Sequence, residues 1–496
     1  MSPRSASSSL PTLVHVSATA PQPLHRQLYA SLRDAIVHGR LSAGMRLPAA
    51  RTLAQDAGVS RNTAASALDQ LRAEGYVIMR ERIGTFVTDT LPDSMLESRE
   101  RHGARSGGQP PRNLRNDGPH AVKATVPRVH FPDRDAAPRA FRTGLPALDA
   151  FPWTLWSRLM ARRIRTSMHA LGDYGASCGY EPLRSAIADY LQVSRGARCT
   201  PAQVLITAGA QQALHLVSRL LIAPGDPVWM EDPGFPGARG VLAASGAHVI
   251  PVPLDANGID VAEGMRRGAD ARLVYVTPSH QYPTGITMSA SRRLELLNWA
   301  TQARAWILED DYDSEFRYSS RPLNCLQGID TSGRVLYVGS FSKVLFPALR
   351  LGYVVLPEFL IDDFWRMRQM IDRHSDVVQQ AVVADFIAQG HFARHIRRMR
   401  LLYEERRNAL LSCAEMLSDR LEFAQSDAGI HVLAWLRSRE SDLTLSHRAL
   451  THDVEIRPIS VTCIEVDLRG FLLGYAAFSP RTIRAAAERL ARSLTK

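Results

Sequence analysis

The chain of 496 residues contains very little lysine. Of its 60 basic residues 57 are arginines, and the three lysines are Lys123, Lys343 and Lys496. Arginine stays protonated in proteins and cannot supply an amine nucleophile. Any chemistry that needs a side-chain amine must therefore use one of these three residues.

Cysteine is also scarce, and long apolar runs are missing. The five cysteines stand singly with no CxxC pair, which excludes a disulfide scaffold, gives no zinc motif and predicts a reducing cytoplasm. No apolar segment follows Arg4, so no signal peptide is predicted. The lack of any run of about 18 apolar residues excludes a membrane-spanning helix.

The composition changes along the chain and predicts two domains. Residues 1–21 are rich in Ser, Pro, Ala and Thr and are predicted to be disordered. Residues 22–89 have a compact, mainly helical pattern. Residues 90–137 are rich in Gly, Pro, Arg and Asn, which is typical of a flexible linker. Strands alternate with helices over residues 138–496, which predicts an α/β domain.

The first domain has the pattern of a helix-turn-helix. One helix carries Leu28, Leu32, Ala35 and Ile36 on one face, and a second covers residues 49–57. After the Gly58-Val59 turn, Ser60 is a candidate N-cap of a third helix, whose inward positions are Ala64, Leu68 and Leu71. This leaves the polar residues Arg61, Asn62 and Thr63 exposed at the helix start, where a helix-turn-helix reads bases in the major groove. The same pattern is compatible with a three-helix bundle whose polar turn is only solvated.

Two segments, GRLSAGMRLPAARTLA (39–54) and VSRNTAASALDQLRAEGYV (59–77), closely resemble the winged helix of GntR-type bacterial regulators. Residues 76–88, YVIMRERIGTFVT, are expected to form the wing, with Gly84 at its turn. The resemblance implies binding to double-stranded promoter DNA. The residues that it assigns to DNA contact are Arg51, Ser60, Arg61, Asn62, Thr63, Gly84 and Thr85.

The second domain is expected to contain a mostly parallel sheet covered by helices on both faces. The predicted strands are residues 204–207, 228–231, 273–277, 306–310, 335–339 and 351–356. Ligands of such sheets bind beyond the carboxyl ends of the strands, and the motifs described next lie at such ends.

Lys343 lies in the segment SFSKVLFPALRLGY (340–353), which follows a strand. A lysine at this place can form a Schiff base with an aldehyde, and Arg350 with Ser340 or Ser342 can hold a phosphate. A surface lysine is the simpler interpretation. However, this chain has replaced lysine by arginine almost everywhere, so a retained lysine indicates an amine that can lose its proton.

Two further segments provide groups that suit a phosphorylated pyridine cofactor. WILEDDYDSEF (306–316) ends a buried strand in carboxylates, one of which can pair with a protonated pyridine nitrogen, while a nearby tyrosine can bind the ring hydroxyl. The same carboxylates could hold a metal ion or cap a helix, but no second cluster of metal-ligand spacing accompanies them. ITAGAQQAL (206–214) has the strand, glycine turn and helix start of an anion site.

Together these motifs resemble the fold type I, aspartate-aminotransferase-like family, which implies pyridoxal 5′-phosphate as the cofactor and a small additional α/β subdomain. The resemblance assigns the Schiff-base amine to Lys343, the pyridinium contact to Asp310, the ring-hydroxyl contact to Tyr312 and the phosphate contact to Arg350. Gly209, Ala210 and Gln211 match the helix start that holds the phosphate. Phe235 matches the aromatic residue over the ring, although it could be an ordinary core residue.

The chain departs from aminotransferases at two places. Tyr282 stands before Pro283 where aminotransferases usually have asparagine, and HQYPTG with EDDYDSEF resembles the MocR-type subgroup of GntR regulators. A family member that binds an amino-acid effector has an arginine for its carboxylate in a loop near the C-terminus, but the aligned residue here is Val461. Arg457 or another arginine could replace it.

Two functions follow from these patterns. The first is a regulator, expected to be a homodimer and head-to-tail by resemblance, that senses an amino acid, an amine or pyridoxal phosphate itself through aldimine chemistry at Lys343 and changes its binding to promoter DNA. The alternative is a working aminotransferase with an accessory N-terminal domain. Residues 24–88 favour the regulator, because a metabolic aminotransferase has no need of a wing or an exposed Arg-Asn-Thr turn.

Overall fold

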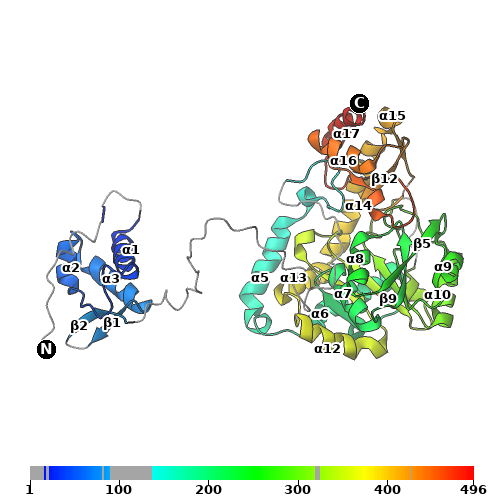
Figure 1. The fold of residues 1–496 in the computed structure, drawn as a ribbon. Coiled ribbons are helices and arrows are strands. Elements are labelled where there is room, and N and C mark those ends of the chain that lie inside the picture. Colours follow the sequence, from blue (N-terminus) through cyan, green and yellow to red (C-terminus); the bar gives the residue numbers. More distant parts are fainter. Residues whose placement is uncertain are drawn as a thin grey trace, which may run out of the picture. The chain divides into compact units, whose positions relative to one another are not determined.

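The computed structural model describes residues 16–17, 22–80, 83–89, 137–318, 324–425 and 427–495. The chain divides into two compact units, residues 1–117 and 118–496 (Figure 1). The predicted disordered N-terminus, residues 1–21, lies outside the described residues except for Val16 and Ser17, and so does the predicted linker except for Ala137. Lys123 and Lys496 also lie outside them.

The first unit consists of three helices and a β-hairpin: α1 (Leu24–Val37), α2 (Ala50–Asp56), α3 (Arg61–Ala73), β1 (Val77–Arg80) and β2 (Gly84–Val87). Helix α1 buries the four residues predicted from their spacing, Leu28, Leu32, Ala35 and Ile36. On α3 the predicted inward residues Ala64 and Leu71 are buried, and Leu68 is half-buried and packs against the same core. Ala67 is a further buried residue of α3 that was not predicted.

The ends of α3 and of the hairpin follow from local chemistry. The Ser60 hydroxyl caps α3 by accepting a hydrogen bond from the Thr63 backbone N–H at 3.1 Å. Strands β1 and β2 pair antiparallel, with Val77 opposite Val87 and Arg80 opposite Gly84. Gly84 is therefore the first residue of β2 rather than part of the turn itself.

The second unit is built on an eight-stranded sheet with the order β3-β10-β9-β8-β7-β4-β5-β6. Its strands are β3 (Val204–Thr207), β4 (Pro227–Asp232), β5 (His248–Asp255), β6 (Gly258–Ile259), β7 (Leu273–Val276), β8 (Trp306–Asp311), β9 (Val335–Ser340) and β10 (Gly352–Val355). All strands predicted from the sequence are present. The sheet is mixed rather than uniformly parallel, because β10 runs antiparallel to both β3 and β9.

The reversal of β10 positions the site. In the register of the sheet, Gly352 at the start of β10 lies opposite Thr207 at the end of β3 and Ser340 at the end of β9. Arg350, just before β10, is therefore brought to the same edge as the carboxyl ends of the neighbouring strands. A Cβ atom on Gly352 would lie 2.9 Å from the Cα of Gly209, so a glycine is needed for this close approach.

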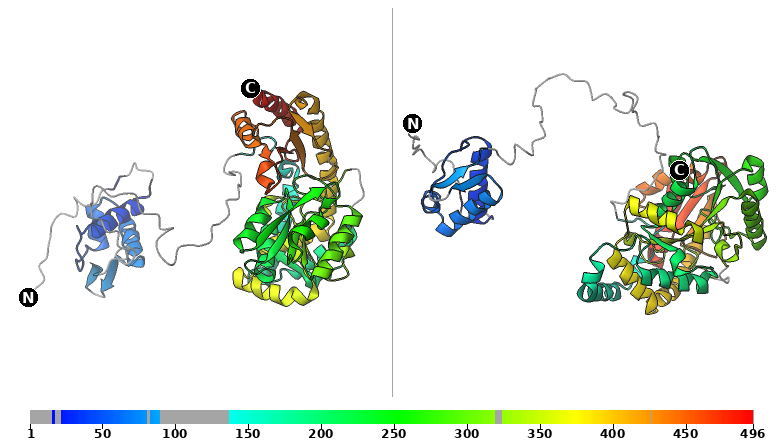
Figure 2. Two further views of the ribbon diagram at one scale, coloured as in Figure 1. Left: turned by 45° about the vertical axis from the view of Figure 1, so that its right-hand side comes forward. Right: turned by 90° about the horizontal axis from the view of Figure 1, so that it is seen from below.

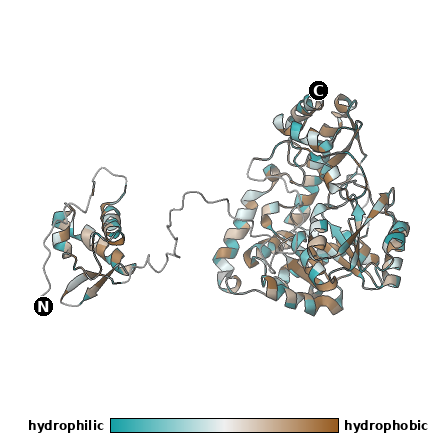
Figure 3. Cartoon of the chain, in the orientation of Figure 1, coloured by the Kyte–Doolittle hydropathy of each residue, from teal (hydrophilic) through white to brown (hydrophobic). Residues whose placement is uncertain are grey.

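Helices cover both faces of the sheet. Polar and apolar residues alternate along these helices (Figure 3). One face packs on α7 (Ala210–Leu221), α8 (Pro236–Ala244) and α12 (Ile361–Ile371). The other face packs on α6 (Glu181–Arg195), α9 (Val261–Gly268), α10 (Ala290–Ala303), α11 (Leu326–Ile329) and α13 (Val377–Ala388), with α5 (Trp153–Leu171) against α13.

The C-terminal part forms a smaller lobe beside the large sheet (orange and red in Figure 2). Its four-stranded antiparallel sheet has the order β11-β12-β14-β13. The elements are α14 (His391–Leu411), α15 (Ala414–Leu417), β11 (Leu421–Phe423), β12 (His431–Leu436), α16 (Asp442–Thr451), β13 (Arg457–Pro458), β14 (Gly470–Gly474) and α17 (Pro480–Leu494). None of the described helices combines the length and apolar character that crossing a membrane requires.

Candidate functional site

A cavity of about 240 Å³ lies at the strand edge described above. The structure places every residue predicted to hold the cofactor around this one cavity: Lys343, Asp310, Tyr312, Arg350, Ser340, Ser342, Gly209, Ala210, Gln211 and Phe235. They come from segments more than 130 residues apart in the sequence, brought together by the sheet topology.

One end of the cavity is suited to an anion. Helix α7 begins at Ala210, and its N-cap, Gly209, has φ +104° and no side chain to cap the helix. The N–H groups at the start of a helix carry partial positive charge and bind anions. Ser340, Ser342 and the guanidinium of Arg350 also line the cavity, and the Ser342 backbone N–H donates to the Ser340 hydroxyl at 3.2 Å.

Lys343 lies in the middle of this set. Its side chain is half-buried, and Nζ donates a hydrogen bond to the Gly144 carbonyl at 3.0 Å. Gly144 belongs to the segment between the first described residues of this unit and α5. A Cβ atom at position 144 would lie 2.9 Å from Nζ, so the segment passes directly over the amine.

Asp310 is the buried carboxylate of the cavity. Its Oδ2 accepts a hydrogen bond from the Tyr275 hydroxyl at 2.7 Å, whereas Oδ1 is buried and has no hydrogen-bond partner among the described residues. Burial raises the pKa of Asp310 to about 6, against the lowering effect of the Tyr275 hydrogen bond. A cationic N–H donor at Oδ1 would satisfy this atom and favour the ionised carboxylate.

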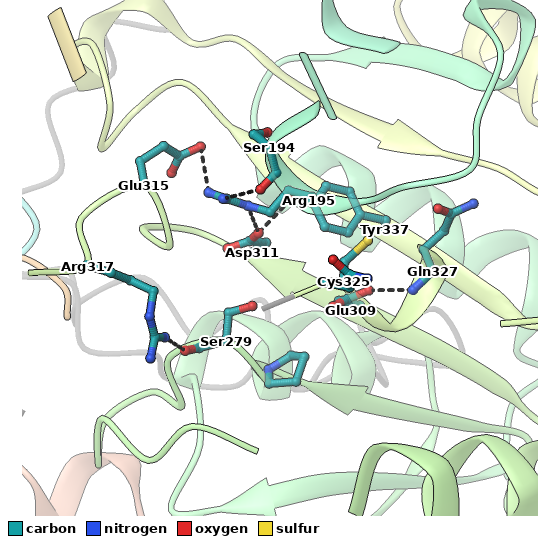
Figure 4. Close-up of polar contacts among 12 residues, drawn as sticks. Ser194, Arg195, Ser279, Glu309, Asp311, Glu315, Arg317, Cys325, Gln327 and Tyr337 are labelled. Carbon is teal, nitrogen blue, oxygen red and sulfur yellow. Dashed lines mark hydrogen bonds and ion pairs between the residues drawn. The ribbon is translucent and has the colours of Figure 1, made fainter. Parts of the chain in front are cut away.

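Three other carboxylates of WILEDDYDSEF, Glu309, Asp311 and Glu315, have structural partners (Figure 4) and do not line the cavity. Asp311 accepts from Arg195 Nε at 2.9 Å and from the Tyr337 hydroxyl at 2.7 Å. Glu309 accepts from the backbone N–H groups of Leu326 and Gln327 at the start of α11, which is the helix-cap role considered above. Among the described residues no group of three His, Cys, Asp or Glu side chains could hold a metal ion.

Several lining residues were not predicted from the sequence: Thr143, Gly144, Gly237, Tyr275, Thr277, Ile430 and His431. Tyr275 lies on β7 on the same face as Asp310 on β8, and strand alternation could have indicated it. His431 begins β12 in the small lobe, more than 80 residues from Lys343, and no local pattern points to it. Tyr282 and Arg457 also line the cavity, whereas Val461 is not among the lining residues.

The predicted DNA-contact residues all lie at the surface of the first unit. Arg51, Ser60, Arg61 and Asn62 are exposed, and Thr63, Gly84 and Thr85 are half-buried. Two further arginines flank the wing: the Arg80 guanidinium lies 4.9 Å from the centre of the Phe86 ring, and Arg46 lies beside Gly84. Neither arginine was predicted from the sequence.

Comparisons with known proteins agree with this architecture. Residues 24–87 match the family described as bacterial regulatory proteins, gntR family, and residues 154–490 match aminotransferase class I and II. The chain belongs to the MocR-type regulators, in which a gntR-type DNA-binding domain is joined to a domain of the pyridoxal-phosphate-dependent aminotransferase fold.

Among individual relatives, the chain is 40% identical to "Probable rhizopine catabolism regulatory protein MocR" of Rhizobium meliloti, over 93% of this chain and 92% of that protein. It is 32% identical to the HTH-type transcriptional regulator TauR of Rhodobacter capsulatus, over 95% of this chain and 96% of TauR. The crystal structure of Pyrococcus horikoshii kynurenine aminotransferase superposes with a TM-score of 0.67 at 27% identity, covering 72% of this chain and 90% of the enzyme.

Proposed function

We propose that this protein is a cytoplasmic transcription regulator that binds promoter DNA through residues 22–89 and senses a small amine or amino acid through pyridoxal phosphate in the cavity of residues 138–496. The observation that carries the proposal is the buried Oδ1 atom of Asp310, which has no partner among the described residues and lines the same cavity as Lys343 and the start of α7. These three groups fit the ring nitrogen, the aldehyde and the phosphate of pyridoxal phosphate. The bound cofactor supplies an aldehyde carbon that condenses reversibly with amines.

Each predicted residue has a distinct task in this proposal. Lys343 provides the amine that holds the cofactor covalently, and Asp310 accepts the ring N–H. Arg350, Ser340 and Ser342, with the backbone at Gly209, Ala210 and Gln211, bind the phosphate. Tyr312 binds the ring hydroxyl. Phe235 packs against the ring, its own ring held edge-on by Tyr282 with 5.7 Å between centroids.

The effector is proposed to bind beside Arg457 and His431. The Nε of Arg457 and the Nε2 of His431 are buried and have no hydrogen-bond partner among the described residues. Burial, with the charges of Lys343 and Arg457 and the neighbouring His280, lowers the pKa of His431 well below its ordinary value, so its ring is neutral. Arg457 is then the cation available to an acidic group of the effector, in place of the arginine that position 461 lacks.

DNA recognition is assigned to the exposed start of α3. Arg61 can bond guanine and Asn62 adenine, while Arg51, Ser60, Thr63, Gly84 and Thr85 are assigned to nearby backbone and groove contacts. The regulator is proposed to act as a homodimer, head-to-tail by its resemblance to the family, so that two α3 helices read two half-sites.

The proposal is tested by gel retardation of the protein's own promoter fragment, with and without pyridoxal phosphate and a set of candidate amines. We expect the cofactor or an amine to change the affinity of the wild type for DNA, and Lys343→Ala to bind DNA without this response. An amino-transfer assay on the same samples tests the alternative. Multiple turnovers of transfer, together with no retardation under any condition, would establish an aminotransferase and refute the regulator.

A further inference from the structure

Behind the cavity, Tyr312, His280 and Asp313 form a buried chain of hydrogen-bonding groups. His280 follows β7, and Tyr312 and Asp313 follow β8. The Nδ1 atom of His280 lies 3.0 Å from the Tyr312 hydroxyl oxygen and 3.0 and 3.2 Å from the two carboxylate oxygens of Asp313. The side chains of His280 and Asp313 are 2% and 0% exposed.

The hydrogen bonds among Tyr312, His280 and Asp313 determine which of their side-chain atoms carry protons. A buried carboxylate needs a donor, and His280 Nδ1 is the donor that the described residues offer to Asp313. Nδ1 therefore carries a proton, whether the ring is neutral or charged. A protonated Nδ1 cannot accept from Tyr312, so the tyrosine oxygen accepts a share of the N–H and its own O–H proton must point elsewhere. Tyr312 lines the cavity, and the cavity is the open direction.

We infer that His280 and Asp313 are positioning residues, which fix Tyr312 as a hydrogen-bond donor into the cavity, toward the ring hydroxyl oxygen of pyridoxal phosphate. This deepens the proposed function and rests on it for the identity of the acceptor.

The small lobe packs directly on this pair and holds it in place. Gly429, two residues before the cavity residue His431, has φ +86°, and a Cβ atom there would collide with the His280 ring and lie 2.9 Å from Asp313 Oδ2. The Gly429 carbonyl is itself held by the hydroxyls of Tyr318 and Tyr475, each at 2.6 Å. The His431 ring lies 5.4 Å from that of His280. The pair is thus enclosed on the side away from Tyr312.

The proton position can be measured without the cofactor. Two-bond ¹H–¹⁵N correlation spectra of protein labelled at histidine distinguish the ring tautomers, and His280→Gln assigns the signal. We expect Nδ1 of His280 to be protonated in the wild type, and the signal to change to the Nε2-protonated form in Asp313→Ala, where Nδ1 can accept from Tyr312. An unprotonated Nδ1 in the wild type would overturn the inference.

The role toward the cofactor is tested by titrating pyridoxal phosphate and recording the visible spectrum of the complex. Asp313→Ala, which removes the acceptor of the His280 N–H, should shift the absorption in the same direction as Tyr312→Phe and weaken cofactor binding by about three- to tenfold, the value of one hydrogen bond. Asp313→Asn keeps an amide oxygen that can accept from Nδ1, and it should have a smaller effect than Asp313→Ala. Asp385→Asn, which breaks an ion pair with Arg163 on α5, is the matched control and should leave the spectrum unchanged.

The outcomes separate the two proposals. A shift in Tyr312→Phe with none in Asp313→Ala, both folded by circular dichroism, overturns the positioning role while the cofactor assignment stands. If pyridoxal phosphate binds neither to the wild type nor to Lys343→Ala, the proposed function fails and the role toward the cofactor fails with it. The tautomer spectrum then still decides whether Asp313 sets the proton of His280.

Discussion

Asp310 and Asp311 are adjacent in the sequence, yet β8 directs them to opposite faces of the sheet, where their donors differ in charge. Oδ2 of Asp311 accepts from the Arg195 guanidinium and the Tyr337 hydroxyl, while its Oδ1, like that of Asp310, is buried without a partner among the described residues. Asp310 has a single neutral donor and one oxygen without a partner among the described residues. Buried polar atoms without partners are costly to stability and concentrate at functional sites. The free protein is therefore expected to be more stable without the Asp310 charge.

Asp310→Asn should stabilise the cofactor-free protein at alkaline pH by about 1–3 kcal/mol. The folded-state pKa of Asp310 is raised to about 6, so its contribution to stability is full below pH 4 and is lost as the pH rises through 6, whereas asparagine stays neutral. Denaturant unfolding at pH 8 and pH 5 measures the difference, which should narrow at the lower pH. The same variant should bind pyridoxal phosphate more weakly. Equal stability of the two proteins at both pH values would contradict the raised pKa.

Lys343→Ala should abolish covalent retention of the cofactor. Borohydride reduction followed by dialysis should leave the wild type with bound cofactor, measured by absorbance and by an added mass, and leave the variant without it. Lys123→Ala and Lys496→Ala are matched controls, because they remove the chain's two other lysines. Loss of labelling in the Lys123 variant would reassign the amine.

At the scale of elements, hydrophobic periodicity predicted the strands and most core positions, because burial on both faces of the sheet leaves nearly continuous apolar runs. It could not predict the direction of β10, since a buried strand reads the same in either direction. It also could not tell which of the neighbouring residues Ala67 and Leu68 is fully buried, because both of them pack toward the core of the first unit. His431 and Gly144 reach the cavity through tertiary packing, which no local pattern records.

Helix α3 provides a matched pair of arginines for testing DNA recognition. Arg61 at its start and Arg72 at its end are both exposed, so either alanine variant should fold normally. Arg61→Ala should weaken binding to the specific operator by about 1–3 kcal/mol, and Arg72→Ala should change it much less. Fluorescence anisotropy at fixed salt, with a scrambled fragment as reference, measures both. Equal effects of the two substitutions would place the recognition surface elsewhere.

At the scale of the whole molecule, the proposed homodimer carries two copies of α3, and its operator should therefore contain two half-sites. We expect sedimentation to show two chains per operator fragment and nuclease protection to span both half-sites, with a single half-site bound more weakly. A complex with one chain per operator would contradict the dimer.

The hydrogen bond from Lys343 to Gly144 has a consequence beyond holding an amine. An ammonium group has three protons to donate, and a lysine nitrogen that becomes covalently bonded gives some of them up. A change in the number of protons on Nζ would alter the hydrogen bond that the Gly144 carbonyl receives. Two residues before Gly144, Arg142 forms an ion pair of 2.6 Å with Glu455 of the small lobe, and the described part of the second unit starts seven residues before Gly144, at Ala137. A covalent change at the Lys343 nitrogen would therefore change the hydrogen bonding of the first described segment of this unit.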